Sequence, residues 1–192
     1  HTTNTFRTRR QLFPDRWREL ARRAVELARS AIPPTHRVAG SIAPLEDCYR
    51  PDLSPVRRDR TGTRAEHLAL ARVLADAGCD LLLCETFPDV EEGLLALDAA
   101  LETGKPCWIS FTPGYRADLL QPAEIAAAAL CAARAGAQAV LVNCLPASNA
   151  LTYLTPLGGA LAGTGVPFGC YANAGTADAK MGWISRPRAS PQ

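Results

Sequence analysis

The polar residues of this sequence that are best placed for chemistry follow directly after apolar runs. The run "AVLV" leads into Asn143 and Cys144, and the run "LLLC" leads into Glu85. A third apolar segment, "WISF", contains Ser110. If these runs are parallel strands, their ends meet on one rim, which is where barrels built from such strands carry their chemistry. The sequence therefore predicts a hydrogen-bonding site with one carboxylate and one thiol.

The same strand ends argue against several reaction types. They carry no lysine for a Schiff base and no histidine, so Cys144 has no candidate base for cysteine–histidine or serine–histidine hydrolysis. Two simpler interpretations stay open. Cys144 can be a small buried thiol that packs as a hydrophobe, and Glu85 can be a charge at the start of the helix that follows Pro88. The direction of the Cys144 side chain, toward the rim or toward the helices, separates the alternatives for that residue.

The elements that position these residues alternate between strands and helices. The apolar runs are continuous, which is typical of parallel strands buried on both faces. The expected strands cover residues 37–42, 80–86, 107–112, 138–143 and 166–171, and a further strand ends in "TTNTF" at 2–6. The expected helices cover 15–32, a segment opened by a capping box at Thr63–Glu66, a segment from Pro88 to Gly104, 121–136, and 148–163 with a break at Pro156.

This alternation predicts right-handed βαβ units and a parallel sheet. The sheet can close into a (β/α)8 barrel or lie open as a doubly wound sheet, but the sequence has no GxGxxG motif for a nucleotide. We favour a single α/β domain over residues 1–192 of the (β/α)8 TIM-barrel type. Because such a barrel needs about 250 residues, we expect the chain to lack about one strand at its N-terminus and the last βα unit.

Composition restricts the class of partner. The chain has 192 residues, of which 47% are hydrophobic and 21% charged, with a net charge of +2. We expect neither nucleic-acid nor membrane binding, because the charge is small and no apolar run reaches the length of about 18 residues that spans a bilayer. The seven cysteines include no closely spaced pair, which favours free thiols and a cytoplasmic location.

Other features of the sequence have less certain roles. Four cysteines are interpreted as packing residues: Cys79, Cys84, Cys107 and Cys131. Cys170 lies one residue before a strand end, and its orientation decides whether it reaches the site. The long loop at residues 43–61 is either a lid with Tyr49 and Arg50 facing inward or a solvated, proline-rich excursion.

The chain resembles the homocysteine S-methyltransferase family, whose members are zinc- and thiol-dependent barrels. Six motifs carry the resemblance, in the family's order: "TTNTF" (2–6), "AGSIAP" (39–44), "CETFPDVEEG" (84–93), "WISF" (108–111), "VLVNC" (140–144) and "YANAG" (171–175). The family also has an Asp-Gly-Gly segment on its first strand and a Gly-Gly-Cys-Cys segment on its last. Neither occurs here, so we expect the sequence to be trimmed at both ends.

The resemblance implies a role for each matched residue. Cys144 would be one ligand of a catalytic Zn²⁺ ion, whose other two ligands belong to the Cys-Cys pair that this chain lacks. Glu85 would bind the amino group of homocysteine. The residues expected to line the same substrate pocket are Ser110, Asn143, Thr3, Asn4 and Thr5.

The implied reaction is methyl transfer to the thiol of homocysteine, which gives methionine. The activated donor would be of the S-methylmethionine, S-adenosylmethionine, betaine or methylated-folate type, and a homodimer is the assembly that the family suggests. Two alternatives stay open. One is a non-catalytic relative that has lost the zinc site and binds a thiol ligand or a partner protein. The other is an unrelated barrel enzyme acting on a phosphorylated small molecule.

Overall fold

The protein forms one parallel sheet with helices between successive strands. The structure, a computed structural model, describes residues 14–174, 176–178 and 182–184. Its strands are β1 (Ala39–Ile42), β2 (Leu81–Phe87), β3 (Cys107–Phe111), β4 (Ala139–Pro146), β5 (Phe168–Asn173), β6 (Thr176–Asp178) and β7 (Gly182–Ile184). Its helices are α2 (Trp17–Ser30), α3 (Arg60–Asp76), α4 (Val90–Leu101), α5 (Pro122–Ala135) and α6 (Ala150–Leu161), with short 3-10 turns at 51–53, 55–57 and 147–149.

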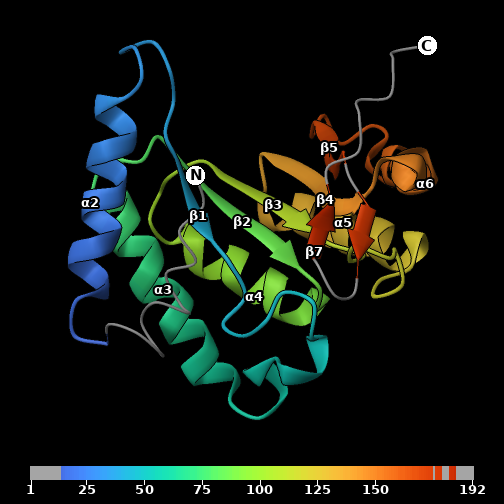
Figure 1. Cartoon of the computed structure of the whole chain (residues 1–192), viewed down its shortest axis with the longest axis horizontal. Helices are drawn as coiled ribbons and strands as arrows, with labels where there is room; N and C mark the ends of the chain where they lie inside the picture. Colours follow the sequence, from blue (N-terminus) through green and yellow to red (C-terminus); the bar gives the residue numbers. More distant parts are fainter. Residues whose placement is uncertain (1–13, 175, 179–181, 185–192) are drawn as a thin grey trace.

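The strand order identifies the architecture. The strands β1 to β5 are all parallel and lie in the order of the sequence, while β6 and β7 form a separate antiparallel pair. A doubly wound sheet would reverse its strand order at a switch point. Here each right-handed crossover instead leads to the adjacent strand, which keeps all the crossover helices on one face of the sheet. Figure 1 shows α3 to α6 along the outer face of the sheet. The expected α/β fold of the TIM-barrel type is confirmed, as part of a barrel wall.

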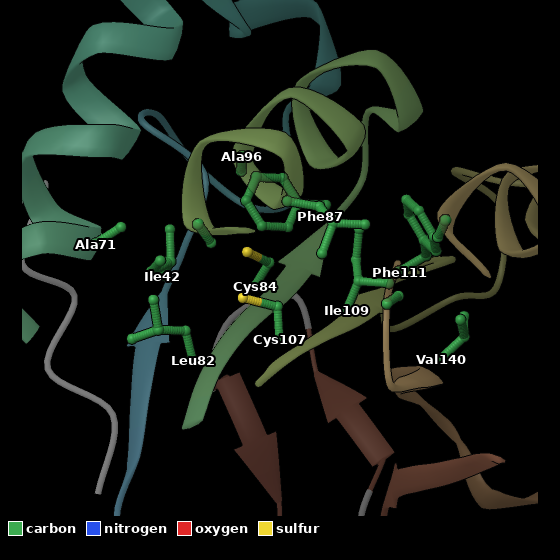
Figure 2. Close-up of a cluster of buried hydrophobic side chains, with 14 of the residues drawn as sticks. Ile42, Ala71, Leu82, Cys84, Phe87, Ala96, Cys107, Ile109, Phe111 and Val140 are labelled. Carbon is green, nitrogen blue, oxygen red and sulfur yellow. The ribbon is translucent and has the colours of Figure 1, made fainter. Parts of the chain in front are cut away.

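The hydrophobic core lies between the sheet and this helix layer. Alternate residues of the strands point to the helices, and they are fully buried: Ile42, Leu82, Cys84, Ile109, Phe111 and Val140. Figure 2 shows them beside Ala71 of α3 and Ala96 of α4, whose small side chains let the helices approach the sheet closely. Burial of each large side chain contributes about 1.5–3 kcal/mol. On the opposite face, Leu83, Trp108 and Leu141 are only half-buried.

One glycine tests how closely α4 packs on the sheet. A Cβ atom at Gly93 would lie 3.0 Å from a ring carbon of Phe111 and 3.1 Å from Cβ of Phe87. We expect Gly93→Ala to destabilise the fold by about 1–3 kcal/mol through overpacking, which outweighs the gain of about 1 kcal/mol in helix propensity. The control is Gly159→Ala in α6, where the described residues leave open space around the new methyl group. Urea denaturation that shifts both midpoints equally would contradict the prediction.

Two expected helix starts and one expected helix break are wrong. Helix α3 begins at Arg60, not at Thr63, because the Asp59 side chain accepts from the Gly62 amide and caps it there. Helix α4 begins at Val90 with Asp89 as its cap, so Pro88 lies outside it. Helix α6 runs unbroken through Pro156, since Tyr153, Leu157 and Leu161 bury one continuous face that holds the helix on the sheet.

None of the helices in the described ranges has the length and apolar character that a membrane span requires.

Candidate functional site

The candidate site lies on the sheet face opposite the helices, at the C-terminal ends of the strands. Side chains alternate between the two faces of a strand, so the residues between the core positions turn to this face. Near the strand ends they are polar: Ser41 of β1, Glu85 of β2, Ser110 of β3, Asn143 of β4 and Tyr171 of β5. The five strands thus supply one contiguous polar cluster, which we call the rim cluster.

Glu85 is the carboxylate of the rim cluster, and it is only 9% exposed. The Ser41 hydroxyl donates to its Oε1 over 2.6 Å, and the Tyr171 hydroxyl donates to its Oε2 over 2.9 Å. Burying a carboxylate is unfavourable unless such bonds satisfy it. Burial, and then the neighbouring Glu85 charge, raise the pKa of Tyr171 above its ordinary value, so this phenol stays a hydrogen-bond donor. The carboxylate faces the rim, not the start of α4, where Asp89 is the cap.

Backbone geometry explains how Asn143 and Cys144 both serve the site although they are adjacent. Cys144 has a φ of +54°, in the left-handed region, and the pairing of β4 with β5 shifts between Asn143 and Pro146. Strand β2 has the same feature: Thr86 has a φ of +67°, and the pairing of β2 with β3 shifts between Cys84 and Phe87. Bulges of this kind re-aim side chains at strand ends. Left-handed non-glycine residues cost about 1–3 kcal/mol each and cluster at functional sites.

Hydrogen bonds then hold the Cys144 thiol in place. The Ser110 hydroxyl donates to Oδ1 of Asn143 over 2.8 Å, which orients the amide. Nδ2 of Asn143 consequently donates to the Thr86 hydroxyl over 2.8 Å and to Sγ of Cys144 over 3.2 Å. Ser110 and Asn143 are buried, and their side chains bond to each other rather than to loop backbone. Their direct role here is to orient the thiol.

The surroundings of Cys144 set its protonation. Burial, and to a lesser degree the negative charge of Glu85, raise the pKa of the Cys144 thiol above its ordinary value, against hydrogen bonds from Tyr49, Thr86 and Asn143 that lower it. The group is therefore a neutral thiol near pH 7 when no cation is bound. A bound metal cation reverses this balance, because coordination deprotonates a thiol outright.

The long loop that follows β1 closes over the rim. It covers residues 43–59, because α3 begins at Arg60, and we call it the β1–α3 loop. Its Tyr49 lies close enough to the Cys144 thiol to lower the pKa of that thiol, and the Tyr49 ring meets the Tyr115 ring edge-on at 5.3 Å. Arg50 instead pairs with Asp52 at the surface. The expected inward orientation is correct for Tyr49 and wrong for Arg50, whose neighbouring carboxylate keeps it in solvent.

The fit of a metal ion to this site is partial. Cys144 supplies one soft donor at a strand end, with a carboxylate nearby, which suits Zn²⁺. Across residues 14–174 and the two short segments beyond, no group of three His, Cys, Asp or Glu side chains is arranged to hold a metal ion. Of the residues described, Cys144 is the one that the expected Zn²⁺ ion would use, and its role as a ligand stays a prediction.

The structure brings together most of the expected site residues. Glu85, Ser110, Asn143 and Cys144 form one hydrogen-bonded and electrostatically coupled cluster. Thr3, Asn4 and Thr5 lie outside the described residues. Cys170 packs against the hydrophobic core on the other face of β5. Cys131, expected to pack, is exposed on α5, because it lies on the solvent side of that helix.

Four residues that contact the site are not among the site residues selected from the sequence: Ser41, Tyr171, Thr86 and Tyr49. Ser41 and Tyr171 stand at strand ends level with Glu85, so the strand-end rule that selected Glu85 had the signal to include them. Thr86 reaches the site only because its backbone is left-handed, and no sequence pattern predicts that conformation for a threonine. Tyr49, which faces inward in the lid interpretation, comes from a loop without periodicity, so the sequence left both interpretations of that loop open.

Comparisons with known proteins agree on one family. The family model described as homocysteine S-methyltransferase matches residues 1–190. The homocysteine S-methyltransferase of Escherichia coli (strain K12) is 35% identical over 167 residues, which are 82% of this chain and 52% of that protein. The crystal structure of the metallated form of the E. coli homocysteine methyltransferase MmuM superposes with a TM-score of 0.67 and 28% identity, over 90% of this chain and 64% of that one.

A second state of the same relative is also similar. The oxidized form of MmuM gives a TM-score of 0.53 with 30% identity, over 81% of this chain and 55% of that one. The chain therefore spans about half to two thirds of the length of the relatives that it matches.

Proposed function

The chain belongs to the homocysteine S-methyltransferase family, and from this membership we propose that the protein transfers a methyl group from an activated donor to the thiol of homocysteine, giving methionine. This membership removes the alternative of an unrelated barrel acting on a phosphorylated substrate. One observation carries the proposal. A buried carboxylate and a hydrogen-bonded thiol, Glu85 and Cys144, stand in one cluster at the strand ends.

The rim cluster suits an amino acid that carries a thiol. In our proposal Glu85 receives the ammonium group of homocysteine, since an ionised carboxylate makes strong, charge-assisted hydrogen bonds. Ser41 and Tyr171 hold that carboxylate from behind, and Asn143, Thr86 and Tyr49 hold Sγ of Cys144. Substrate contact by Ser110, Asn143, Thr3, Asn4 and Thr5 remains part of the proposal.

We further propose that Cys144 is one ligand of a Zn²⁺ ion, with the remaining ligands in a Cys-Cys pair outside this chain. When bound, such an ion keeps a coordinated substrate thiol deprotonated at neutral pH. In the reaction, the S–H proton of homocysteine leaves to solvent and its sulfur forms a bond to the methyl carbon of the donor. The bond from that carbon to the donor's sulfur or nitrogen breaks, and its electron pair stays on the donor.

Our proposals for cellular location and oligomeric state rest on the cysteines and on the family. All seven cysteines lie among the described residues and all are free thiols, which supports our proposal of a reducing compartment such as the cytoplasm. The homodimer suggested by the family stays a prediction that light scattering of the intact protein can test.

The decisive experiment combines metal analysis of the intact protein with a methyl-transfer assay to homocysteine. The donor panel contains S-methylmethionine, S-adenosylmethionine, betaine and a methylated folate. We expect about one zinc ion per chain and methionine formation with one donor class. An intact, folded protein without metal and without transfer from any donor would favour the non-catalytic relative instead.

A further inference from the structure

A buried glutamate outside the rim cluster joins the β1–α3 loop to the helix layer. Glu92, in the first turn of α4, is 1% exposed. Its Oε1 accepts from the backbone amide of Leu45 over 2.8 Å, and its Oε2 accepts from the Ser54 hydroxyl. Nε2 of His67, on α3, lies 3.3 Å from Oε1. One carboxylate thus binds both limbs of the loop and the neighbouring helix.

Further contacts fasten the same two limbs. Leu45 on the first limb and Val56 on the second are buried in the apolar interior. Arg57 pairs with the buried cap residue Asp89 over 3.0 Å, next to the amide of Glu92, which donates to the same carboxylate. The loop is therefore attached at both ends to the N-terminus of α4. It is not the solvated excursion that its proline content allowed.

The segment between the two attachments reaches the site. Tyr49 lies between Leu45 and Ser54, and it contacts Tyr115 in the loop after β3 as well as the thiol of Cys144 at the end of β4. Cys48, beside it, is half-buried. Tyr49 is four residues from the attachment at Leu45 and five from the attachment at Ser54, so loss of these attachments would free it to move away from the sulfur.

From this arrangement we propose that Glu92 is a positioning residue, which holds the β1–α3 loop closed over the rim and so sets Tyr49 against the Cys144 sulfur. Glu92 does not touch the site itself and acts through the backbone of Leu45 and the hydroxyl of Ser54. This inference stands apart from the proposed function, since it concerns access to a thiol whatever reaction the site performs.

The cysteines of the chain provide the test. The intact protein, freed of metal with EDTA, is treated with iodoacetamide, and labelling at each cysteine is followed by peptide mass spectrometry. In the wild type we expect Cys131, which is exposed, to react fast, Cys48 and Cys144 to react slowly, and the buried Cys84 and Cys107 to be protected. Labelling of a covered thiol measures how often its cover opens.

The variant Glu92→Gln keeps the side-chain shape but loses the charge that the Ser54 and Leu45 donors bind. We expect it to speed labelling of Cys48 and Cys144 about tenfold, with Cys84 and Cys107 still protected. The matched control is Glu91→Gln, the neighbouring glutamate, which pairs with Arg60 at the surface and should leave every rate unchanged.

A second variant keeps the test decisive if Glu92→Gln loses its fold and all cysteines react. Ser54→Ala removes one attachment only, and it should speed labelling of Cys48 and Cys144 by several-fold while the sheet cysteines stay protected. Unchanged labelling of Cys144 in a folded Glu92→Gln or Ser54→Ala protein would overturn the proposal. A rise at Cys144 accompanied by an equal rise at Cys84 in both variants would do so too, because it would show a general loss of stability.

Discussion

Replacing Cys144 with serine is expected to reduce methyl transfer to homocysteine by at least about 100-fold, and to lower the zinc content of the intact protein to match. Loss of residues that merely support a metal ligand costs about 10- to 100-fold, so loss of the ligand itself should cost more. Serine preserves the shape of the side chain and can still accept from Asn143. Its oxygen cannot replace a soft thiolate. Metal analysis and initial rates measured on the same preparation give both quantities.

The matched control for this variant is Cys131→Ser. Cys131 is exposed on α5 and takes no part in the rim cluster, so the change should leave both metal content and rate as they are. A Cys144→Ser protein that keeps its zinc and its rate would refute the assignment of Cys144 as a ligand. A protein that keeps its zinc but loses its rate would point to a direct role of the thiol in the reaction.

Replacing Glu85 with glutamine is expected to raise the KM for homocysteine about 100-fold, with a much smaller change in kcat. Removing one partner of a buried, hydrogen-bonded charge pair costs about 2–5 kcal/mol, and about 2.7 kcal/mol corresponds to a factor of 100. The glutamine oxygen can accept from only one of Ser41 and Tyr171, but the other hydroxyl can turn and accept from the glutamine NH2 group, so the rim cluster should stay packed. The substrate's ammonium group alone loses its counter-charge.

A substrate analogue separates this role from a general disturbance of the site. 4-Mercaptobutyrate has the thiol and carboxylate of homocysteine but lacks the amino group. Wild type and Glu85→Gln should therefore use it with similar KM values. If the KM of the variant rises equally for both substrates, Glu85 does not bind the ammonium group.

Tyr171→Phe, which removes one donor to Glu85, should raise the KM for homocysteine by a smaller, several-fold factor.

The closure of the β1–α3 loop bears on the Cys144→Ser experiment. Tyr49 contacts the sulfur that Cys144→Ser removes, so the rate of Cys48 labelling in that variant reports whether the loop still closes. The attachment through Glu92 predicts that it does, since Leu45 and Ser54 are bound on the helix side, away from the thiol.

The fold was predictable because its signals are local and repeated. Each strand is a continuous apolar run and each helix has a periodic apolar face, so composition within a short window determines the element. The order of the elements then implies a parallel sheet. Helix starts are harder to predict, because a single side-chain acceptor determines the first turn. Helix α3 is capped by Asp59 and not by Thr63. Helix α4 is capped by Asp89, so it does not begin at Pro88. Pro156 was misjudged because packing of α6 on the sheet outweighs one missing hydrogen bond.

For this protein the sequence alone determined the strand-end location of Glu85, Ser110, Asn143 and Cys144, since they follow or end apolar runs and parallel strands end on one rim. Only the tertiary structure decided how these residues act together. The left-handed backbone at Thr86 and Cys144, the bonds of Ser41 and Tyr171 to Glu85, and the placement of Tyr49 by Glu92 all join residues distant in the sequence. Their geometry depends on strand pairing and loop packing, and those long-range contacts leave no periodic trace in the order of the amino acids.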